Sequence, residues 1–177
     1  MQRLILSKEA HPLLKPTGIR FAAADHDGCS QRSEEETLIV SELYQDLLKQ
    51  SYVDKHGEKN RITENNILVV APHNMQVNLL KRSLPEGARV GTVDKFQGQE
   101  AEVAIISMAT SSGDYLPRFI EFLYSRNSLN VAISRASCLA ILIASPALMS
   151  IRCTTPEQMA MVNTLCWVRD YSDKQIN

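Results

Sequence analysis

Long apolar runs constrain the fold of this chain more than any other feature. Residues 103–109 and 139–144 are apolar on both faces, and residues 67–71 form a shorter run of the same kind. Strands of this type are typical of a parallel sheet that is covered on both sides, because a half-exposed strand would alternate with polar residues. Residues 19–24 and 89–93 are two further candidate strands.

Amphipathic segments lie between these runs. Ser33 and Glu36 form a capping box ahead of apolar residues at helical spacing up to Leu48, and residues 73–84, 118–124 and 128–136 favour further helices. Thr155 and Pro156 begin a C-terminal helix. Its predicted inward face consists of Met159, Val162, Leu165 and Cys166. The alternation predicts an α/β fold, with a mostly parallel sheet flanked by helices on both faces.

The length of 177 residues fits one domain. Residues 1–18 contain prolines and have no clear period, so we expect an irregular lead-in followed by a domain over 19–177. Residues 51–64 are polar and predict a surface loop. Glu34, Glu35 and Glu36 open a helix, where we expect them to be solvated and to complement the helix dipole.

Composition excludes several classes of protein. With 44% hydrophobic and 22% charged residues the chain is not a disordered one, and its longest apolar runs are far below the roughly 20 residues of a membrane span. The first residues lack the apolar core of a signal peptide, so we expect a cytoplasmic protein. The four cysteines are far apart, which predicts reduced thiols and no metal site. The net charge of −1 means that any contact with nucleic acid must be local.

A polar stretch between two predicted strands is the first place to look for chemistry. Residues 91–100 read Gly-Thr-Val-Asp-Lys-Phe-Gln-Gly-Gln-Glu, and Gln and Glu are rarely buried without a partner. Ligands of parallel sheets bind beyond the strand ends, where we place this stretch, and residues 130–136 should face the same ligand. The sequence contains neither G-x-x-x-x-G-K-[ST] nor G-x-G-x-x-G, so the chain is not a self-sufficient P-loop ATPase.

Residues 91–107 and 130–136 resemble motifs V and VI of superfamily 1 helicases, in the branch of the nonsense-mediated-decay helicase. Residues 70–76 are similar to motif IV. The resemblance covers about residues 19–150 and implies the second RecA-like domain of such a helicase, a domain without its own phosphate loop. The tail over residues 145–167 is similar to that of bacterial members that are fused to a RecB-like nuclease domain.

The resemblance implies roles for particular residues at the nucleotide. Arg135 matches the arginine finger, which stabilises charge on the transferred phosphoryl group. Glu100 matches an acid at the sugar or phosphate side of the nucleotide, with Gln97 and Gly98 shaping its loop. Gln76 either faces the nucleotide or is a satisfied glutamine on a helix surface. The implied cofactor is ATP with Mg²⁺, bound jointly with a first RecA-like domain.

Contacts with nucleic acid in this family follow the backbone of a single strand, at loops and helix starts. The matching positions here are Pro72, His73, Asn74, Thr92, Asp94, Thr110 and Ser111. Each of them can equally be a turn-forming residue.

The sequence also departs from the family pattern. Asn127 and Ser128 stand where a basic pair often precedes motif VI, Ser134 replaces a threonine, and Ser137 stands where another basic residue often follows. A second phosphate-contacting arginine would therefore have to be Arg126 or Arg82.

The chain is therefore expected to act as the C-terminal motor domain of an ATP-dependent DNA or RNA helicase. The 177-residue chain by itself is expected to hydrolyse no ATP. One alternative is a non-catalytic module, derived from a helicase domain, that binds nucleic acid or protein. Another is a small-ligand α/β domain of the dinucleotide-binding kind, against which the missing glycine-rich turn argues.

Overall fold

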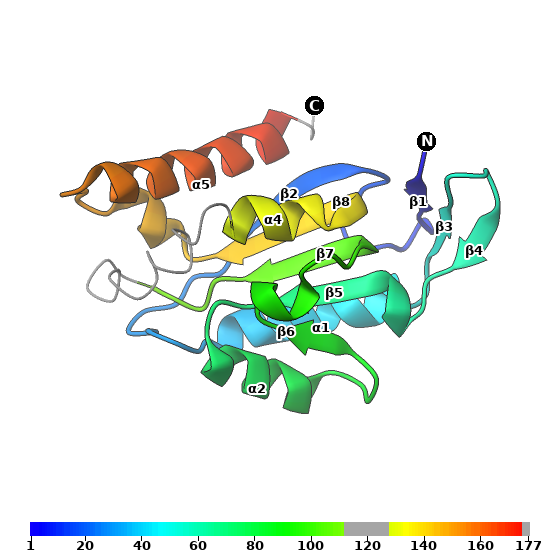
Figure 1. Ribbon diagram of the computed structural model, residues 1–177, viewed down its shortest axis with the longest axis horizontal. Coiled ribbons are helices and arrows are strands. Elements are labelled where there is room, and N and C mark those ends of the chain that lie inside the picture. Colours follow the sequence, from blue (N-terminus) through cyan, green and yellow to red (C-terminus); the bar gives the residue numbers. More distant parts are fainter. Residues whose placement is uncertain (112–127, 175–177) are drawn as a thin grey trace.

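The central sheet has five strands, all parallel, in the order β2-β8-β7-β5-β6 (Figure 1). The structure is a computed structural model that describes residues 1–111 and 128–174. The strands are β2 (Gly18–Ala23), β5 (Ile67–Val70), β6 (Arg89–Gly91), β7 (Ala101–Ser107) and β8 (Ala136–Ala144). The predicted α/β class with a parallel sheet is confirmed.

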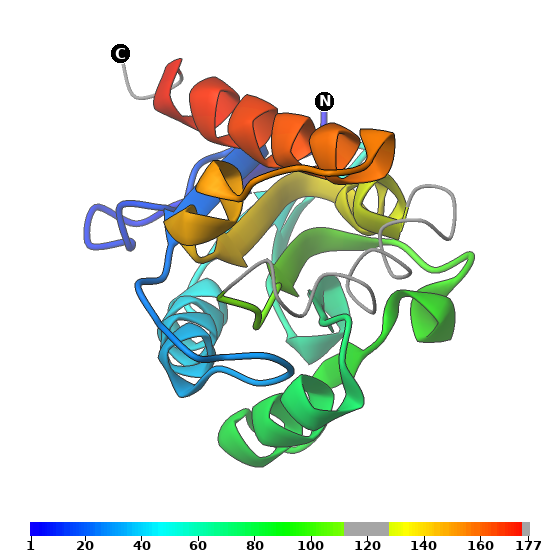
Figure 2. The same ribbon diagram turned by 90° about the vertical axis from the view of Figure 1, so that its left-hand side faces the viewer.

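Helices cover both faces of this sheet. On one face lie α1 (Glu34–Leu47) and α2 (Asn74–Ser83), and on the other lie η2 (Val93–Phe96), α4 (Ser128–Ser134) and α5 (Pro156–Lys174). Figure 2 shows α4 and α5 above the sheet and α1 and α2 below it. Along β7, Val103 and Ile105 enter the core under α1, while Ala104 and Ile106 enter the core under α4 and α5. This explains why the strand is apolar on both faces.

A second, antiparallel sheet forms from segments that we predicted to be irregular. It consists of β1 (Arg3–Ile5), β3 (Ser51–Val53) and β4 (Lys59–Arg61), followed by the short helix η1 (Glu64–Asn66). Leu4 and Leu14 are buried in the same core as α1. The expectation of a plain loop over 51–64 is therefore wrong, whereas the predicted lead-in over 1–18 is irregular apart from β1 and the start of β2. Strands of three residues are too short to show a period.

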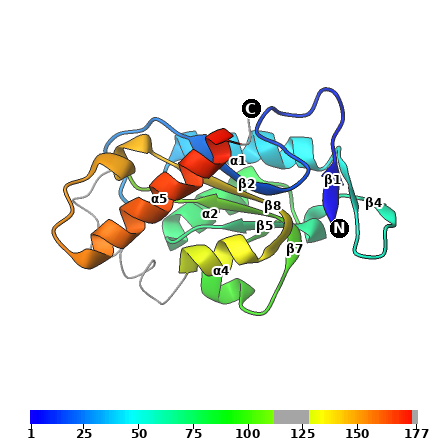
Figure 3. The same ribbon diagram turned by 90° about the horizontal axis from the view of Figure 1, so that it is seen from above.

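The C-terminal helix α5 crosses over β2 (Figure 3), but its inward face differs from the predicted one. Met161, Leu165 and Val168 are buried, whereas Met159 is 56% exposed. Val162 and Cys166 are half-buried. Apolar residues occur all around this helix, so the sequence allows more than one stripe, and packing on the sheet selects the stripe. The predicted helix over 118–124 lies outside the described residues.

Two smaller observations complete the fold. The turn after β8 is the short helix η4 (Pro146–Ser150), and all four cysteines are free thiols. In the described ranges, no helix combines the length and the apolar character that crossing a membrane requires.

Candidate functional site

The parallel sheet divides the predicted site residues between two edges. All strands point the same way, so their carboxyl ends share one edge, toward the viewer in Figure 2, and their amino ends share the other. The residues that follow β5, β6 and β7 lie at the carboxyl edge, and these are Pro72, His73, Asn74, Thr92, Thr110 and Ser111. Glu100 precedes β7 and Arg135 precedes β8, so both lie at the amino edge.

The polar stretch 91–100 runs from one edge to the other. β6 ends with Gly91 and β7 begins with Ala101, so the stretch is the crossover between two parallel strands. Our expectation that it lies as a whole beyond one set of strand ends is wrong for this reason. Thr92 stays near the carboxyl edge, and Glu100 reaches the amino edge.

The crossover is anchored on the sheet face by apolar and backbone contacts. Val93 and Phe96 of η2 are buried in the core beside α4, so the two polar stretches are neighbours. A Cβ on Gly91 would lie 2.5 Å from the side chain of Lys95, whose ammonium donates to the carbonyl of Val90 at 3.0 Å. A side chain at position 91 would therefore require the Lys95 side chain to move.

Polar side chains of the crossover remain in solvent. Asp94, Gln97 and Glu100 are exposed, and Gly98 has a φ of +77°, in the left-handed region that favours glycine. Gln99 is held by Arg89, which donates to its side-chain oxygen at 2.7 Å. The turn that presents Gln97 and Glu100 is therefore defined by its neighbours, while their own side chains stay available.

Arg135 is fixed beside the start of β7. It follows the last residue of α4, its Nε donates to the carbonyl of Val131 at 3.3 Å, and its own carbonyl accepts from the N–H of Ala101 at 2.9 Å. Since Ala101 follows Glu100 directly, this backbone bond brings the two predicted residues to one place. Within the described part of the chain, the rest of the Arg135 guanidinium and the Glu100 carboxylate make no hydrogen bond.

A pocket of about 340 Å³ opens at this edge. Glu100, Glu102 and Ser137 line it from the main sheet, together with residues of the β3–β4 hairpin. Glu102 is already engaged, because it accepts from the side-chain N–H of Asn66 at 2.7 Å. Within the described residues, the amino edge therefore presents the carboxylate of Glu100, which has no hydrogen bond, in an open pocket, with the backbone of Arg135 beside it.

The carboxyl edge has a different character, because it holds the switch point of the sheet. The crossovers after β2 and β5 lead toward β6, and those after β6 and β7 lead back toward β2, so the direction changes between β5 and β7. Such a point is where open α/β sheets bind ligands. Asn74 is exposed beside it, whereas Thr110 and Ser111 are buried. The Thr110 hydroxyl donates to the carbonyl of Ser30 at 3.2 Å.

A buried carboxylate organises this edge. Glu36 is fully buried, and its Oε1 accepts from His26 Nε2 at 2.8 Å. Its Oε2 accepts from the Ser107 hydroxyl at 2.6 Å and from the N–H of Ala109 at 2.9 Å. Glu34 and Glu35 are exposed as predicted, but the prediction of a solvated Glu36 is wrong. The third residue of a first helical turn faces the sheet here, and three donors replace the water that the carboxylate loses.

The same carboxylate holds a strained backbone. Ala109 follows β7 and has a φ of 58°, a left-handed conformation that is uncommon outside glycine. Its N–H is the one that donates to Glu36, so the charged acceptor supports this conformation. The turn directs the next residues, Thr110 and Ser111, back toward the loop that contains Cys29, whose carbonyl accepts from the N–H of Ser111 at 2.8 Å.

His26 connects Glu36 to Ser111. Its Nδ1 lies 2.5 Å from the Ser111 hydroxyl oxygen, which also accepts from the N–H of Cys29 at 3.0 Å. Since Nε2 faces a carboxylate, we assign a proton to Nε2, and the Ser111 hydroxyl can then donate to Nδ1. Every donor in this chain of bonds has an acceptor.

Gln76 belongs to the same network. It is fully buried, and its side-chain N–H groups donate to the Ser33 carbonyl, the Thr37 hydroxyl and the Ser107 hydroxyl at 3.2, 3.1 and 2.9 Å. Its oxygen accepts from the N–H of Ser33 at 2.9 Å. The predicted capping box is therefore half right. Ser33 caps the N–H of Glu36 at 3.1 Å, but Gln76 takes the place of Glu36 at the N–H of Ser33. The amide of Gln76 is engaged within the chain, and we assign it to the network.

The sequence analysis missed His26 and Ser107. Both carry a weak signal, since Ser107 is the one polar residue in an otherwise apolar run and His26 lies in a turn-rich segment after a strand. Neither signal points to a buried network until the two segments are placed side by side. In the ranges 1–111 and 128–174, no group of three His, Cys, Asp or Glu residues could hold a metal ion.

The five-stranded parallel sheet with helices on both faces and a crossover that carries polar motifs defines an α/β domain of the RecA-like type. Residues 17–147 match the AAA domain family, and the chain belongs to that family. It is a superfamily 1 helicase domain of the nonsense-mediated-decay branch, as its motifs and its relatives both indicate.

Three relatives are named as helicases, and two of the names specify a nucleic acid, RNA in one and DNA in the other. An uncharacterized ATP-dependent helicase of Caenorhabditis elegans is 33% identical over 117 residues, which is 66% of this chain and 7% of that protein. The probable RNA helicase armi of Drosophila melanogaster is 34% identical over 99 residues, 51% of this chain and 8% of that protein. The DNA polymerase alpha-associated DNA helicase A of Saccharomyces cerevisiae is 31% identical over 117 residues, 62% of this chain and 16% of that protein. The chain thus spans a small part of the length of the relatives that it matches.

Proposed function

We propose that this chain is the second RecA-like domain of an ATP-dependent helicase, and that Arg135 is its arginine finger. The observation that carries the proposal is the meeting of Arg135 and Glu100 at the amino edge, joined by the backbone bond between Ala101 and Arg135. Arg135 is half-buried, and within the described residues its two terminal nitrogens make no hydrogen bond, which a residue that reaches a phosphate on another domain requires.

The chain lacks a phosphate loop, so the phosphates and the Mg²⁺ ion would be held mainly by a first RecA-like domain. Arg135 would stabilise the charge that develops on the transferred phosphoryl group, and Glu100 would contact the nucleotide, with Gln97 and Gly98 shaping its loop. Closure of the two domains on ATP, and their opening after hydrolysis, would move the nucleic-acid strand.

The nucleic-acid track would follow the carboxyl edge. Asn74 is exposed at this edge, and Asp94 is exposed on the crossover. Pro72, His73 and Thr92 are half-buried, and Thr110 and Ser111 shape the turn behind them. Their position at the switch point of the sheet, away from Arg135, supports this assignment. The backbone of a single strand is the proposed ligand, and either DNA or RNA fits the named relatives.

The test is the change of Arg135 to alanine in the helicase that carries this domain together with a phosphate loop. We expect kcat for ATP to fall by about a thousandfold or more, because the developing charge loses its stabilising cation, while ATP binding stays nearly unchanged. Arg169→Ala is the matched control, since Arg169 is an exposed arginine on α5 to which no role at the nucleotide is assigned. An Arg135→Ala variant that keeps kcat within a few-fold of the unmodified protein would exclude the proposed role.

A second test uses the 177-residue chain by itself. We expect no ATP hydrolysis, because it has no phosphate loop. Robust turnover that grows with the amount of purified chain and disappears in Arg135→Ala would contradict the division of labour between two domains.

A further inference from the structure

The turn of the β3–β4 hairpin stands beside the amino edge of the main sheet, at the right of Figure 1. The pocket of about 340 Å³ lies between them. From the hairpin it is lined by Asp54, Lys55 and His56, and from the edge by Glu100, Glu102 and Ser137. The hairpin therefore shares a pocket with Glu100, although about 45 residues separate them in the sequence.

The turn is rigid before any ligand arrives. Asp54 Oδ1 accepts from the backbone N–H groups of His56 at 2.8 Å and Glu58 at 2.9 Å. The Glu58 bond and the other backbone bonds at this turn hold the pKa of the Asp54 carboxyl below its usual range. Gly57 has a φ of +85°, a left-handed conformation that suits glycine. The tip is thus built without the side chains of Lys55 and His56.

The groups that remain free around the pocket are one acid and two nitrogen donors. Asp54 holds the turn and Glu102 is bound to Asn66, so two of the three carboxylates are engaged. Lys55, His56 and Glu100 are exposed, and no hydrogen bond of their side chains falls within the described part of the chain. A pocket with this set can bind a neutral, polar molecule through both acceptors and donors.

We propose that Lys55 and His56 contact the sugar and base of the nucleotide that Glu100 and Arg135 bind, and that the hairpin thereby contributes to nucleotide affinity. This inference rests on the proposed function. Three carboxylates, from Asp54, Glu100 and Glu102, and one lysine line the pocket, so their excess negative charge disfavours phosphate groups. The pocket therefore suits the uncharged end of a nucleotide rather than its triphosphate. Lysine and histidine can donate to ring nitrogens and oxygens of that end.

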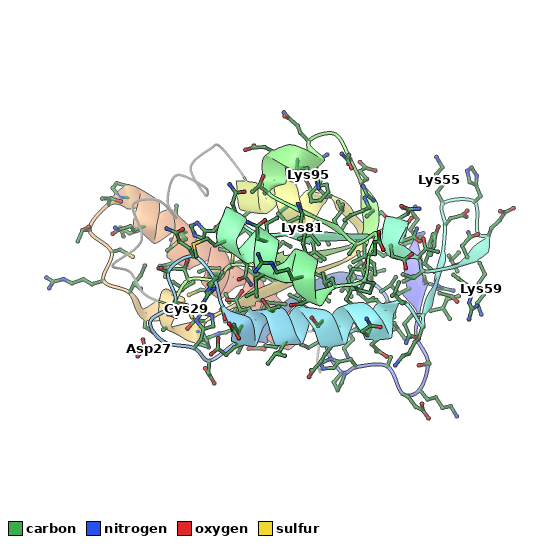
Figure 4. The ribbon with its side chains drawn as sticks, turned by 90° about the horizontal axis from the view of Figure 1, so that it is seen from below. Asp27, Cys29, Lys55, Lys59, Lys81 and Lys95 are labelled. Carbon is green, nitrogen blue, oxygen red and sulfur yellow. The ribbon has the colours of Figure 1, made fainter. Side chains whose placement is uncertain are left out.

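The first experiment compares two lysines of the same hairpin in the helicase that carries this domain and a phosphate loop. Figure 4 labels both Lys55, at the tip, and Lys59, on β4. Both are exposed, but only Lys55 lines the pocket. We expect Lys55→Ala to raise KM for ATP about five-fold with kcat within two-fold, as loss of uniform binding does. His56→Ala should act in the same direction, and Lys59→Ala should leave KM unchanged.

The second experiment locates the contact directly. 8-Azido-ATP carries its photoreactive group on the base, and we expect it to label the peptide that contains residues 54–56, with protection by excess ATP. The inference is overturned if Lys55→Ala and Lys59→Ala give the same KM, or if the base labels only other segments. Arg135→Ala in the same assay separates the two ideas: if it leaves kcat intact, the proposed function fails, and if it abolishes kcat while Lys55→Ala has no effect, only the hairpin inference fails.

Discussion

Carboxylates at the two edges of the sheet have opposite environments. At the carboxyl edge, Glu36 is fully buried and accepts three hydrogen bonds, and the polar residues around it satisfy one another. At the amino edge, Glu100 is exposed and has no hydrogen bond within the described residues. A buried carboxylate with three donors contributes to stability and fixes the shape of a turn. An exposed carboxylate beside a pocket can bind a ligand, as the proposed nucleotide site requires.

The difference also separates two kinds of candidate residue. Thr110, Ser111 and Gln76 are polar, but their side chains already have partners inside the chain. Within the described residues, the terminal nitrogens of Arg135 and the carboxylate of Glu100 have no hydrogen-bond partner. Polar character in a motif therefore does not by itself mark a ligand contact. The remaining hydrogen-bonding capacity of each side chain does.

The largest effect should come from removing the buried carboxylate. Glu36→Ala leaves His26, Ser107 and the N–H of Ala109 without their acceptor, and each unsatisfied buried donor costs about 1–3 kcal/mol. We expect the free energy of unfolding to fall by about 3–5 kcal/mol in total. Glu100→Ala removes the same group from an exposed position and should change it by no more than about 0.5 kcal/mol. Urea unfolding of the 177-residue chain measures both. Equal losses in the two variants would break the comparison between the edges.

A smaller loss is expected at Gln76. Gln76→Ala removes an amide with four hydrogen bonds, and the free energy of unfolding should fall by about 2 kcal/mol. Asn78→Ala, an exposed amide on the same helix, is the control and should have almost no effect. In the ATPase assay of the helicase that carries this domain and a phosphate loop, KM for ATP should stay unchanged in Gln76→Ala. A raised KM for ATP without any loss of stability would return Gln76 to the nucleotide site.

The smallest effect is expected at Tyr44, eight residues after Glu36 on α1. Tyr44 is fully buried, and its hydroxyl has no hydrogen-bond partner within the described residues. Burial raises the pKa of this phenol to about 12, and Glu64 adds to the shift. Tyr44→Phe should therefore leave the free energy of unfolding unchanged or raise it by up to about 1 kcal/mol, because an unpaired buried hydroxyl is removed. A loss of more than about 1 kcal/mol would mean that the hydroxyl has a partner.

The motifs and the central sheet were predictable from local patterns. The apolar runs 67–71, 103–109 and 139–144 coincide with most of β5, β7 and β8, because the side chains of these strands are buried on both faces. The small sheet of β1, β3 and β4 was not predictable, since each strand has three residues and β1 pairs with β3 across about 50 residues of chain. For the same reason, the pocket between Lys55 and Glu100 could not be predicted from the sequence.

The sequence by itself determined the family, the α/β class and the missing phosphate loop. It also identified Arg135 and Glu100 as candidate nucleotide-binding residues. Only the tertiary structure decided which polar side chains have hydrogen-bond partners within the described residues and which do not. Glu36 and Glu100 are the same residue type in polar segments that look alike, and one is buried with three partners while the other stands in solvent. The reason is physical: composition and spacing record what a side chain can bind, whereas its remaining hydrogen bonds depend on which distant segments the fold places beside it.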